Sequence, residues 1–393
     1  MIEKNFTGIC MKKIIALFTI GACALQSAHA IKIVAGPYIQ QFDENSATIV
    51  WATDVDGVSW VEVAPDDGSH FYAQARPKFF DAPMGKKQIT KIHRVKVKGL
   101  ESGKKYFYRV FTKEMAGGEG ERVFYGNIAS TRVFRVTPPS IKTLEKDKES
   151  LQFTVVNDIH EDVKRLETFL KDIEGDDFVV FNGDMMSNIR TQQQMYDGCL
   201  VQATKSTKSS MPILYSRGNH ETRGAASELF IKFFPTDTNK PYYAKKIGKF
   251  FFIFLDSGED KPDSDIEYSD TADFDNYRKE QAQWLEKIVN SDDFKNAYKR
   301  IIITHIPPAW GAWHGSINFR KYFSPVLKGK KIDVIFSGHL HGDYRYFEPS
   351  EDFDMPCVVN SNMEKIKVKA TKDEIICDFY DIKSNKVRTT VIK

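Results

Sequence analysis

The sequence predicts two structural parts, an N-terminal all-β sandwich followed by an α/β domain with two stacked mixed β-sheets flanked by helices. Residues 31–137 contain short runs rich in Val, Ile, Thr, Tyr and Trp between turn signals, without a long amphipathic helical stretch. In residues 151–393, apolar strand-like runs alternate with helical patterns, which is typical of sheets covered by helices. Residues 138–150 begin with two prolines and are rich in Lys and Glu, so we predict a linker there.

Length and composition are those of an ordinary globular protein. A chain of 393 residues predicts two or three domains, and 41% hydrophobic residues are enough for a sizeable core. The formal net charge is +3, and positive and negative residues are interspersed without a basic run. This pattern gives no reason to expect nucleic acid or an acidic membrane surface as a partner.

The first thirty residues have the pattern of a bacterial secretory signal peptide. A basic segment that begins at Met11 precedes the apolar run 14–25, and Ala28-His29-Ala30 fits a small-x-small cleavage site. We expect the start at Met11, a mature chain from about Ile31, and export to the periplasm or the outside. In the alternative interpretation Cys23 is acylated, as in a lipoprotein, and the protein is anchored to a membrane.

Three cysteines follow residue 30, which is too few for a dense disulfide framework. One disulfide bridge is compatible with an oxidising compartment, and buried thiols at Cys357 and Cys377 are the alternative. A transmembrane helix needs about 20 consecutive apolar residues. No run in the chain approaches this length.

The strands of the N-terminal part are expected where β-branched and aromatic residues gather, and several of them alternate apolar and polar residues. The main runs are Ala47–Thr53, Val58–Val63, His93–Val97 and Tyr106–Thr112. A Gly-flanked turn at residues 99–103, followed by Tyr106-Phe107-Tyr108, resembles the turn and strand of fibronectin type III domains. We therefore predict a fibronectin type III-like sandwich.

The α/β part is expected to contain two clear helices. Residues 162–173 place four apolar side chains on one face after an acidic start, and residues 276–289 have a second helical pattern. The predicted strands are 153–156, 178–181, 213–215, 250–255, 301–304, 333–336, 357–359, 366–368, 375–380 and 387–392.

Five short polar motifs follow apolar runs in this part of the chain. They are Asp158-Ile159-His160, Gly183-Asp184, Gly218-Asn219-His220-Glu221, Thr304-His305 and Gly338-His339-Leu340-His341. In α/β folds the crevice beyond the carboxyl ends of the strands is where ligands bind. Five of the nine histidines fall in these motifs. The sequence therefore predicts that the motifs meet in one site.

The donor types in the motifs indicate metal binding. Asp, Asn and His offer hard oxygen and borderline nitrogen atoms without a thiolate, which suits Mn, Fe or Zn better than a structural zinc site. His339 and His341 are two residues apart in a segment expected to be extended, so they point to the same side and can serve two neighbouring ions. Asp184 is the carboxylate that we expect to bridge those ions.

Residues from about 151 to 345 resemble the calcineurin-like metallophosphoesterases, whose signature is D-x-H, G-D, G-N-H-[DE], a lone His and G-H-x-H in that order. With the N-terminal sandwich, the arrangement is similar to that of purple acid phosphatases. The resemblance implies two divalent metal ions and attack by a hydroxide that bridges them. It implies a first ion on Asp158, His160, Asp184 and His341, and a second on Asp184, Asn219, His305 and His339. His220 resembles a catalytic histidine that stabilises the phosphoryl group or protonates the leaving oxygen, and Glu221 is expected to orient a neighbour.

The chain departs from the purple enzymes at two positions. It has His160 where they have glycine, and Ser187 where they have the tyrosine that follows the bridging aspartate by three residues. The tyrosinate ligand that gives the purple colour is missing. We therefore predict a colourless enzyme that uses divalent ions.

Other residues near the motifs are candidates for substrate contacts. Arg217 and Arg223 flank the third motif and could clamp a phosphate, or could face solvent. His314, with Trp310 and Trp313, lies in a Gly-containing loop after His305 and could form the substrate rim or pack as part of the loop.

These features together predict a secreted phosphoesterase that hydrolyses phosphate monoesters of a small phosphorylated substrate. One alternative is a phosphodiesterase or nucleotidase with the same metal centre, since the pocket walls decide between these reactions. Another is a surface binding protein whose metal site is vestigial, although none of the seven ligand positions is degenerate.

Overall fold

The computed structural model describes residues 30–342 and 344–393. The predicted signal peptide, with Cys23, therefore lies outside the described residues except for Ala30. Residues Ile31–Lys393 pack as one compact unit. Among the residues described, no helix is both long and apolar enough to cross a membrane. Cys199, Cys357 and Cys377 are buried free thiols, as in the second of the two interpretations of these cysteines.

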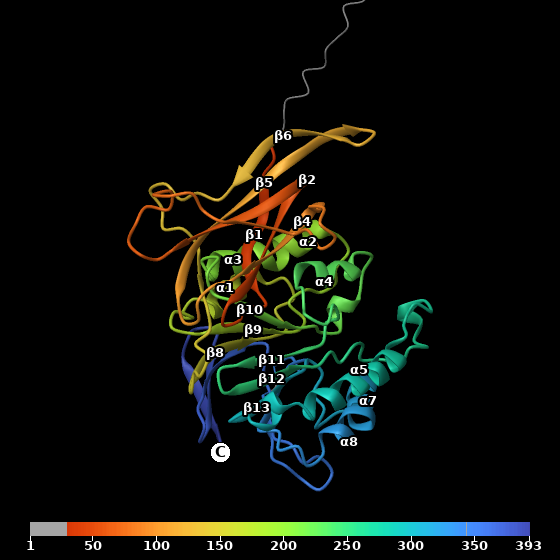
Figure 1. Ribbon diagram of the computed structural model, residues 1–393. Coiled ribbons are helices and arrows are strands. Elements are labelled where there is room, and N and C mark those ends of the chain that lie inside the picture. The colour runs from red at the N-terminus through yellow and green to blue at the C-terminus, as the bar shows by residue number, and fades with distance from the viewer. Residues whose placement is uncertain (1–29, 343) are drawn as a thin grey trace, which may run out of the picture. The chain divides into compact units, whose positions relative to one another are not determined.

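The N-terminal region is all-β, with seven strands that form one hydrogen-bonded sheet (Figure 1). Its strands are β1 (Ile33–Gln40), β2 (Ser46–Pro65), β3 (Lys78–Phe80), β4 (Ile89–Lys98), β5 (Lys105–Glu119), β6 (Arg122–Ser130) and β7 (Ser140–Lys142). Strand β7 lies in the segment predicted as a linker and pairs with β5. The chain thus continues this sheet for several residues beyond the two prolines.

Strand β2 joins two halves of the sheet. Its first part pairs with β1 and β4, and its second part pairs with β3 and β5. The register with β4 shifts between Ala52 and Gly57. A Cβ atom at Gly57 would lie 2.5 Å from the Thr112 side chain, so glycine permits the close approach of β5. The two strands predicted for 47–53 and 58–63 are therefore one strand with an irregularity between them.

The β region is fastened to the rest of the unit by buried side chains. The hydroxyl of Tyr38 donates to the carbonyl oxygen of Phe233 at 2.7 Å, and that of Tyr108 donates to Ser209 at 2.6 Å. The ring of Phe42 lies 5.9 Å from that of Phe178. The two regions thus share a continuous apolar core.

The α/β region contains two six-stranded sheets. The order in the first is β10-β9-β8-β17-β18-β19, with β8, β9 and β10 parallel, and in the second β11-β12-β13-β14-β16-β15, with β12, β13, β14 and β16 parallel (Figure 1). The strands of the first sheet are β8 (Leu151–Val156), β9 (Phe178–Asn182), β10 (Ile213–Ser216), β17 (Glu364–Ala370), β18 (Ile375–Asp381) and β19 (Lys386–Ile392). Those of the second are β11 (Tyr243–Ile247), β12 (Phe250–Phe254), β13 (Lys299–Ile303), β14 (Val334–Ser337), β15 (Arg345–Phe347) and β16 (Cys357–Val359).

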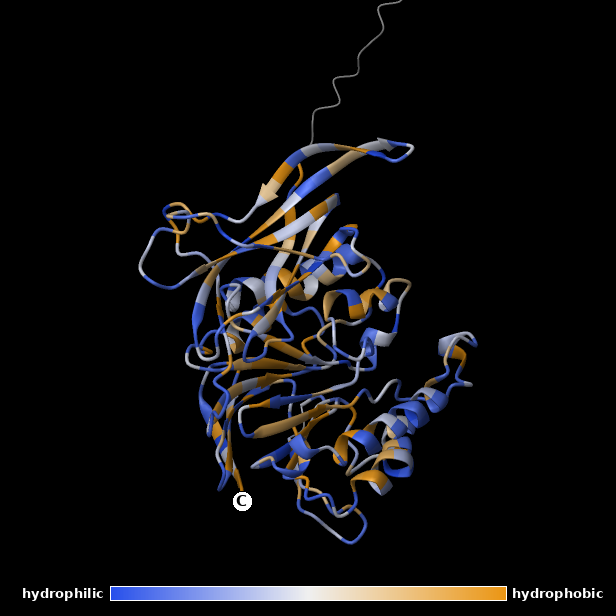
Figure 2. Ribbon diagram, in the orientation of Figure 1, coloured by the Kyte–Doolittle hydropathy of each residue, from blue (hydrophilic) through white to orange (hydrophobic). Residues whose placement is uncertain are grey.

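The two sheets pack face to face through aromatic side chains. Phe153 of β8 stacks on Phe178 of β9 at 4.9 Å and meets Phe252 of β12 edge-on at 5.6 Å. These rings are fully buried, and each contributes about 1.5–3 kcal/mol through removal of apolar surface from water. Figure 2 shows apolar residues concentrated in these central strands. The mixed sheets predicted for this region are confirmed.

The helices are short except for α5. They are α1 (Val163–Phe169), α2 (Gln192–Met195), α3 (Val201–Ser206), α4 (Phe230–Phe233), α5 (Phe274–Val289), α6 (Asp292–Lys295), α7 (His314–Asn318) and α8 (Ser324–Leu327), and π-helical turns at Tyr196–Leu200 and Phe319–Phe323 join α2 to α3 and α7 to α8. Asp162 caps α1 by accepting from the backbone N–H of Arg165. Helix α1 ends four residues before the predicted end, whereas α5 begins two residues before its predicted start.

Candidate metal centre

Each of the five polar motifs begins where a parallel strand ends. Asp158 follows β8, Asp184 follows β9 and Asn219 follows β10 in the first sheet. His305 follows β13, and His339 follows β14, in the second sheet. The carboxyl ends of parallel strands meet at one edge of a sheet, so the fold brings the motifs of both sheets to one place.

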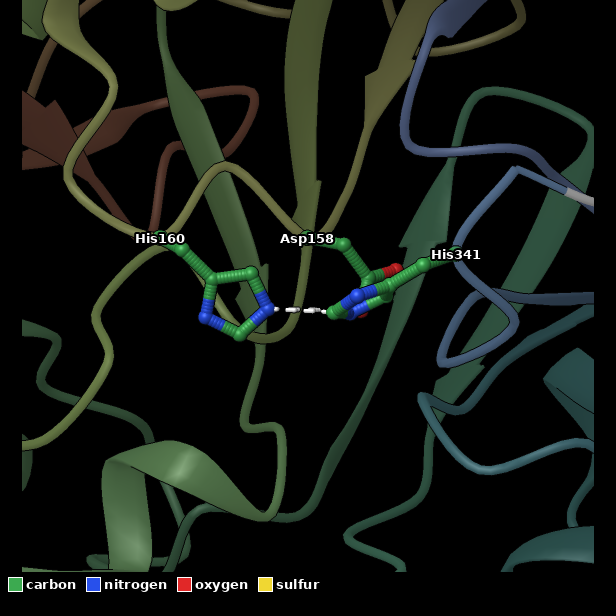
Figure 3. A group of neighbouring side chains, drawn as sticks. All are labelled: Asp158, His160 and His341. Carbon is green, nitrogen blue, oxygen red and sulfur yellow. Dashed lines mark hydrogen bonds and ion pairs between the residues drawn. The ribbon is translucent and has the colours of Figure 1, made fainter.

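A first group of side chains gathers around Asp158. His341 Nε2 lies 3.1 Å from Asp158 Oδ1, and His160 Nε2 lies 3.0 Å from His341 Nε2. Figure 3 shows the two imidazole rings reaching toward each other beside the carboxylate. The ligand atoms of the three residues all lie within 4.8 Å of one another, which is close enough for one cation to bind all three.

A second group gathers around Asp184. His305 Nε2 lies 2.9 Å from Asp184 Oδ2, and His339 belongs to the same cluster of potential ligand atoms within 4.8 Å. The amide oxygen of Asn219 lies 3.1 Å from His339 Nδ1. Asp184 also forms a third such group, with His160 and His220. The carboxylate of Asp184 therefore lies between the two halves of the cluster.

The donor set fits divalent cations. Asp158 and Asp184 are 0% and 1% exposed, which is costly for two carboxylates unless positive charge neutralises them. His305 Nε2 is buried and, among the described residues, has no hydrogen-bond partner of suitable geometry despite the nearby Asp184 oxygen. A ring nitrogen that is buried beside two carboxylates without a hydrogen-bond partner suits a metal ligand better than it suits a packed core.

The charges of the cluster also favour the binding of cations. Burial by itself raises the pKa of Asp158, but the positive charge of His305 and a hydrogen bond from His341 outweigh burial and hold the pKa below its usual value. The same balance between burial and His305 lowers the pKa of Asp184. Burial opposes the charge on His305, yet Asp184 and Asp158 raise its pKa to about 10. The two carboxylates thus remain ionised and attract positive charge.

The backbone of the cluster is held in an uncommon conformation. Asp158, His160, Asp184 and His339 all have positive φ values, of 51°, 48°, 53° and 72°. Non-glycine residues in this left-handed region cost of order 1–3 kcal/mol each and are concentrated at functional sites. Packing around the cluster must therefore hold these residues in place.

Glu221 supplies part of that packing. Its side chain is fully buried, and Oε2 accepts hydrogen bonds from the backbone N–H groups of Asp184 and Gly218, both at 2.9 Å. Oε1 accepts from the N–H of Met186 at 3.0 Å and from the hydroxyl of Tyr215 at 2.8 Å. One carboxylate therefore ties the loop after β9 to the loop after β10.

Two asparagines support Asp158 and were not identified from the sequence. The amide of Asn157 donates to Asp158 Oδ2 at 2.7 Å, and the amide of Asn360 donates to Asn157 Oδ1 at 2.7 Å. Asn360 follows strand β16, at the same edge as the motifs. In the sequence, the signal that could have identified both residues is an asparagine directly after an apolar run.

His220 is oriented toward the cluster by its own backbone contacts. Its Nδ1 lies 2.8 Å from the carbonyl oxygen of Ser187, which can only accept, so Nδ1 carries a proton. Its Nε2 lies 4.0 Å from Asp184 Oδ2, and the side chain is partly exposed. The nitrogen that faces the cluster is thus the one that can exchange a proton with a bound molecule.

The two arginines predicted to contact substrate are paired with buried acids. Arg217 lies 2.6 Å from Asp256, and Arg223 makes two hydrogen bonds to Glu259, at 2.9 and 2.8 Å. Asp256 and Glu259 are 0% and 1% exposed. Each guanidinium therefore neutralises a buried carboxylate, and contact of either arginine with a phosphate stays a prediction.

His314 is also engaged, with Asp275 of α5. Its Nε2 lies 2.7 Å from Asp275 Oδ1, and its backbone N–H donates to the carbonyl oxygen of Asp260 at 2.8 Å. These contacts hold His314 in its loop, and its role at the substrate rim stays a prediction. Trp313 of the same loop reaches the cluster.

A cavity of about 840 Å³ lies apart from the cluster. It is bounded by the β region near β7 and by residues 171–177 and 206–212, and it contains none of the predicted ligands. We locate the functional site at the cluster because buried ionised groups converge there.

Buried carboxylates, imidazoles and an amide at the carboxyl edge of two stacked sheets define the site of a metal-dependent hydrolase. Residues 151–343 match the family model of the calcineurin-like phosphoesterases. The chain therefore contains a calcineurin-like phosphoesterase domain, the catalytic domain of metal-dependent phosphoric ester hydrolases.

Known proteins resemble the chain at low identity. It is 27% identical over 294 residues to purple acid phosphatase 22 of Arabidopsis thaliana, covering 68% of this chain and 56% of that protein. It is 26% identical over 285 residues to purple acid phosphatase 21 of the same plant, covering 66% and 54%. The chain therefore spans about half the length of these relatives. The structure of Yfce, a phosphoesterase from E. coli, has 11% identity and a TM-score of 0.31, covering 62% of this chain and 100% of that one.

Proposed function

We propose that the protein hydrolyses phosphate monoesters with two divalent cations bound at the cluster. The observation that carries this proposal is the position of Asp184, whose carboxylate belongs to two groups of potential ligands at once. A carboxylate shared in this way can bind two neighbouring ions. The first ion would be held by Asp158, His160, Asp184 and His341, and the second by Asp184, Asn219, His305 and His339.

The residues divide the chemistry among them. Divalent cations at such a site act as Lewis acids on phosphoryl oxygens and lower the pKa of water toward about 7. His220 presents Nε2 toward the cluster and donates a proton from that atom to the leaving oxygen, while the Ser187 carbonyl fixes the other nitrogen. Glu221 keeps Asp184 in its left-handed conformation.

We further propose divalent rather than ferric chemistry and a colourless protein. In this chain the position of the purple enzymes' tyrosine is occupied by Ser187, whose carbonyl oxygen contacts His220. An iron-loaded sample should show no intense visible absorption band, and the appearance of such a band would contradict this part of the proposal.

The proposal includes export and a fibronectin type III-like fold for the β region. Export rests on the signal-peptide pattern that ends at Ala30, and the lipid-anchored form would depend on Cys23. Because the turn at residues 99–103 and the following strand resemble fibronectin type III domains, we propose that kind of sandwich for the β region.

A hydrolysis assay on the chain from Ile31 tests the main proposal. The protein is stripped with a chelator, reloaded with Mn, Zn or Fe, and given 4-nitrophenyl phosphate and bis(4-nitrophenyl) phosphate side by side. We expect monoester cleavage that is lost in Asp184→Asn and His339→Ala but kept in His70→Ala, an exposed histidine of the β region.

Two other outcomes have definite meanings. A preference for the diester would establish a phosphodiesterase in place of the monoesterase. Two bound ions without turnover of either ester would contradict the proposed activity and favour a surface binding protein with a vestigial metal site.

A further inference from the structure

We propose that Trp310 and Trp313 form an aromatic platform that selects phosphate esters whose leaving group carries an aromatic ring. This inference rests on the proposed phosphoesterase function, since it names the class of substrate for the same site. The platform consists of these two side chains in the loop between β13 and α7.

The platform begins at a proposed metal ligand. The ring of Trp313 lies 4.8 Å from the imidazole of His339, at an interplanar angle of 86°. The ring of Trp310 lies 5.4 Å from that of Trp313, at 66°. Two aromatic contacts thus lead from the metal cluster to the protein surface.

A glycine and an arginine hold the loop that carries the platform in one conformation. Gly311 has a φ of 99°, and a Cβ atom there would lie 2.2 Å from the Trp313 ring, so only glycine lets the indole fold over the backbone. Arg320 donates hydrogen bonds to the carbonyl oxygens of Pro308 at 2.8 Å and Gly311 at 2.9 Å. A platform fixed in advance loses little conformational entropy when a ligand binds.

Trp310 is placed to meet a ligand. It is 39% exposed and is the only exposed member of the five tryptophans, all of which lie in the described residues. The guanidinium carbon of Arg345 lies 4.1 Å from the centroid of its ring, which adds positive charge beside the aromatic surface. An exposed indole on a loop held by these contacts, next to a cation and one ring from a proposed metal ligand, fits a planar group attached to an anion.

An aromatic leaving group matches these features better than an alkyl group. A ring that extends from a phosphate at the cluster can pack on the indole faces or edges, and aromatic pairs gain more than their buried area alone provides. A short alkyl group on the same phosphate would make only a small apolar contact with the indole rings. The platform should therefore raise the affinity for aromatic phosphate esters relative to that for alkyl esters.

Direct binding of two phosphonates tests the inference without turnover. Benzylphosphonate and ethylphosphonate carry the same head group and are not hydrolysed, so isothermal calorimetry on the metal-loaded chain measures each Kd. We expect benzylphosphonate to bind about threefold to tenfold more tightly than ethylphosphonate. Trp310→Ala should reduce this ratio to near one, and Trp310→Phe should keep most of it.

A matched control separates the platform from a general loss of exposed aromatic surface. Phe134→Ala removes a 68% exposed ring from the β region and should leave the Kd ratio unchanged. An equal Kd for the two ligands in the unmodified protein, or an unchanged ratio in Trp310→Ala, would overturn the inference and leave the phosphoesterase proposal standing. Failure of both phosphonates to bind would overturn the two together.

Discussion

Replacing Glu221 by glutamine should weaken metal binding although Glu221 is not among the proposed ligands. The carboxylate accepts four hydrogen bonds, three of them from backbone N–H groups that include that of Asp184. Glutamine keeps the shape of the side chain but converts one acceptor oxygen into an NH₂ donor. The substitution therefore tests whether the bonds of this side chain to the loop after β9 help to position Asp184.

The expected magnitude follows from the partners of each oxygen. The hydroxyl of Tyr215 can rotate and accept from the new amide, so the amide nitrogen should take the Oε1 side, where the N–H of Met186 then lacks an acceptor. One unsatisfied buried donor costs about 1–3 kcal/mol. Burial and the charge of Asp184 raise the pKa of Glu221, so removing its charge offsets part of this cost. We expect a net loss of about 1–2 kcal/mol in the free energy of unfolding.

Glu221→Ala is the more severe variant, because it leaves three buried N–H groups without an acceptor. We expect it to lose at least about 3 kcal/mol. Substitution of groups that orient metal ligands lowers metal affinity about tenfold to a hundredfold. Glu221→Gln should therefore raise the Kd for Mn or Zn within that range.

Two measurements check this prediction on the chain from Ile31. Urea unfolding of the metal-free protein gives the stability change, and calorimetric titration with Mn or Zn gives the affinity. Glu228→Gln, an exposed glutamate of the same segment, is the control and should change neither quantity. Wild-type metal affinity in a folded Glu221→Gln protein would refute the reasoning.

Two further predictions concern residues away from the proposed ligands. Burial lowers the pKa of His93 to about 3, so below about pH 6.5 the unfolded chain takes up a proton that the folded chain does not. Stability should therefore fall by about 1.4 kcal/mol per pH unit as the pH drops from about 6.5 toward 4, and His93→Asn should flatten this slope in pH-dependent urea unfolding; equal slopes would contradict the assignment. Arg223→Met should cost about 3 kcal/mol because it leaves the buried Glu259 carboxylate without its cation. The double variant with Glu259→Gln should recover part of this loss, and full additivity of the two changes would argue against the pair.

The predicted ligands were accessible to sequence reasoning because each follows an apolar strand. Strand ends at a common edge are a property of the fold, so seven polar residues spread from Asp158 to His341 could be expected to meet, and the structure brings them together. The mixed α/β sheets were predictable for the same reason, since continuous apolar runs mark buried parallel strands.

The partners of the outer charged residues could not be predicted in this way. Arg217 and Arg223 stand beside the third motif, but the acids that bind them, Asp256 and Glu259, follow β12 and are brought near only by the folded chain. The pairing of Asn157 with Asn360 spans 203 positions. Such long-range pairs have no local pattern, because only tertiary packing selects them.

The contact between Phe42 and Phe178 makes the N-terminal region more than a detachable module. Phe178 begins β9, the strand that ends beside Asp184, and it stacks on Phe153 of β8, the strand that ends beside Asp158. A truncation that removed residues 31–150 would open this aromatic stack to water directly behind the two strands that carry the carboxylates. Fragments made for experiments on this protein should therefore keep the β region and the α/β region together.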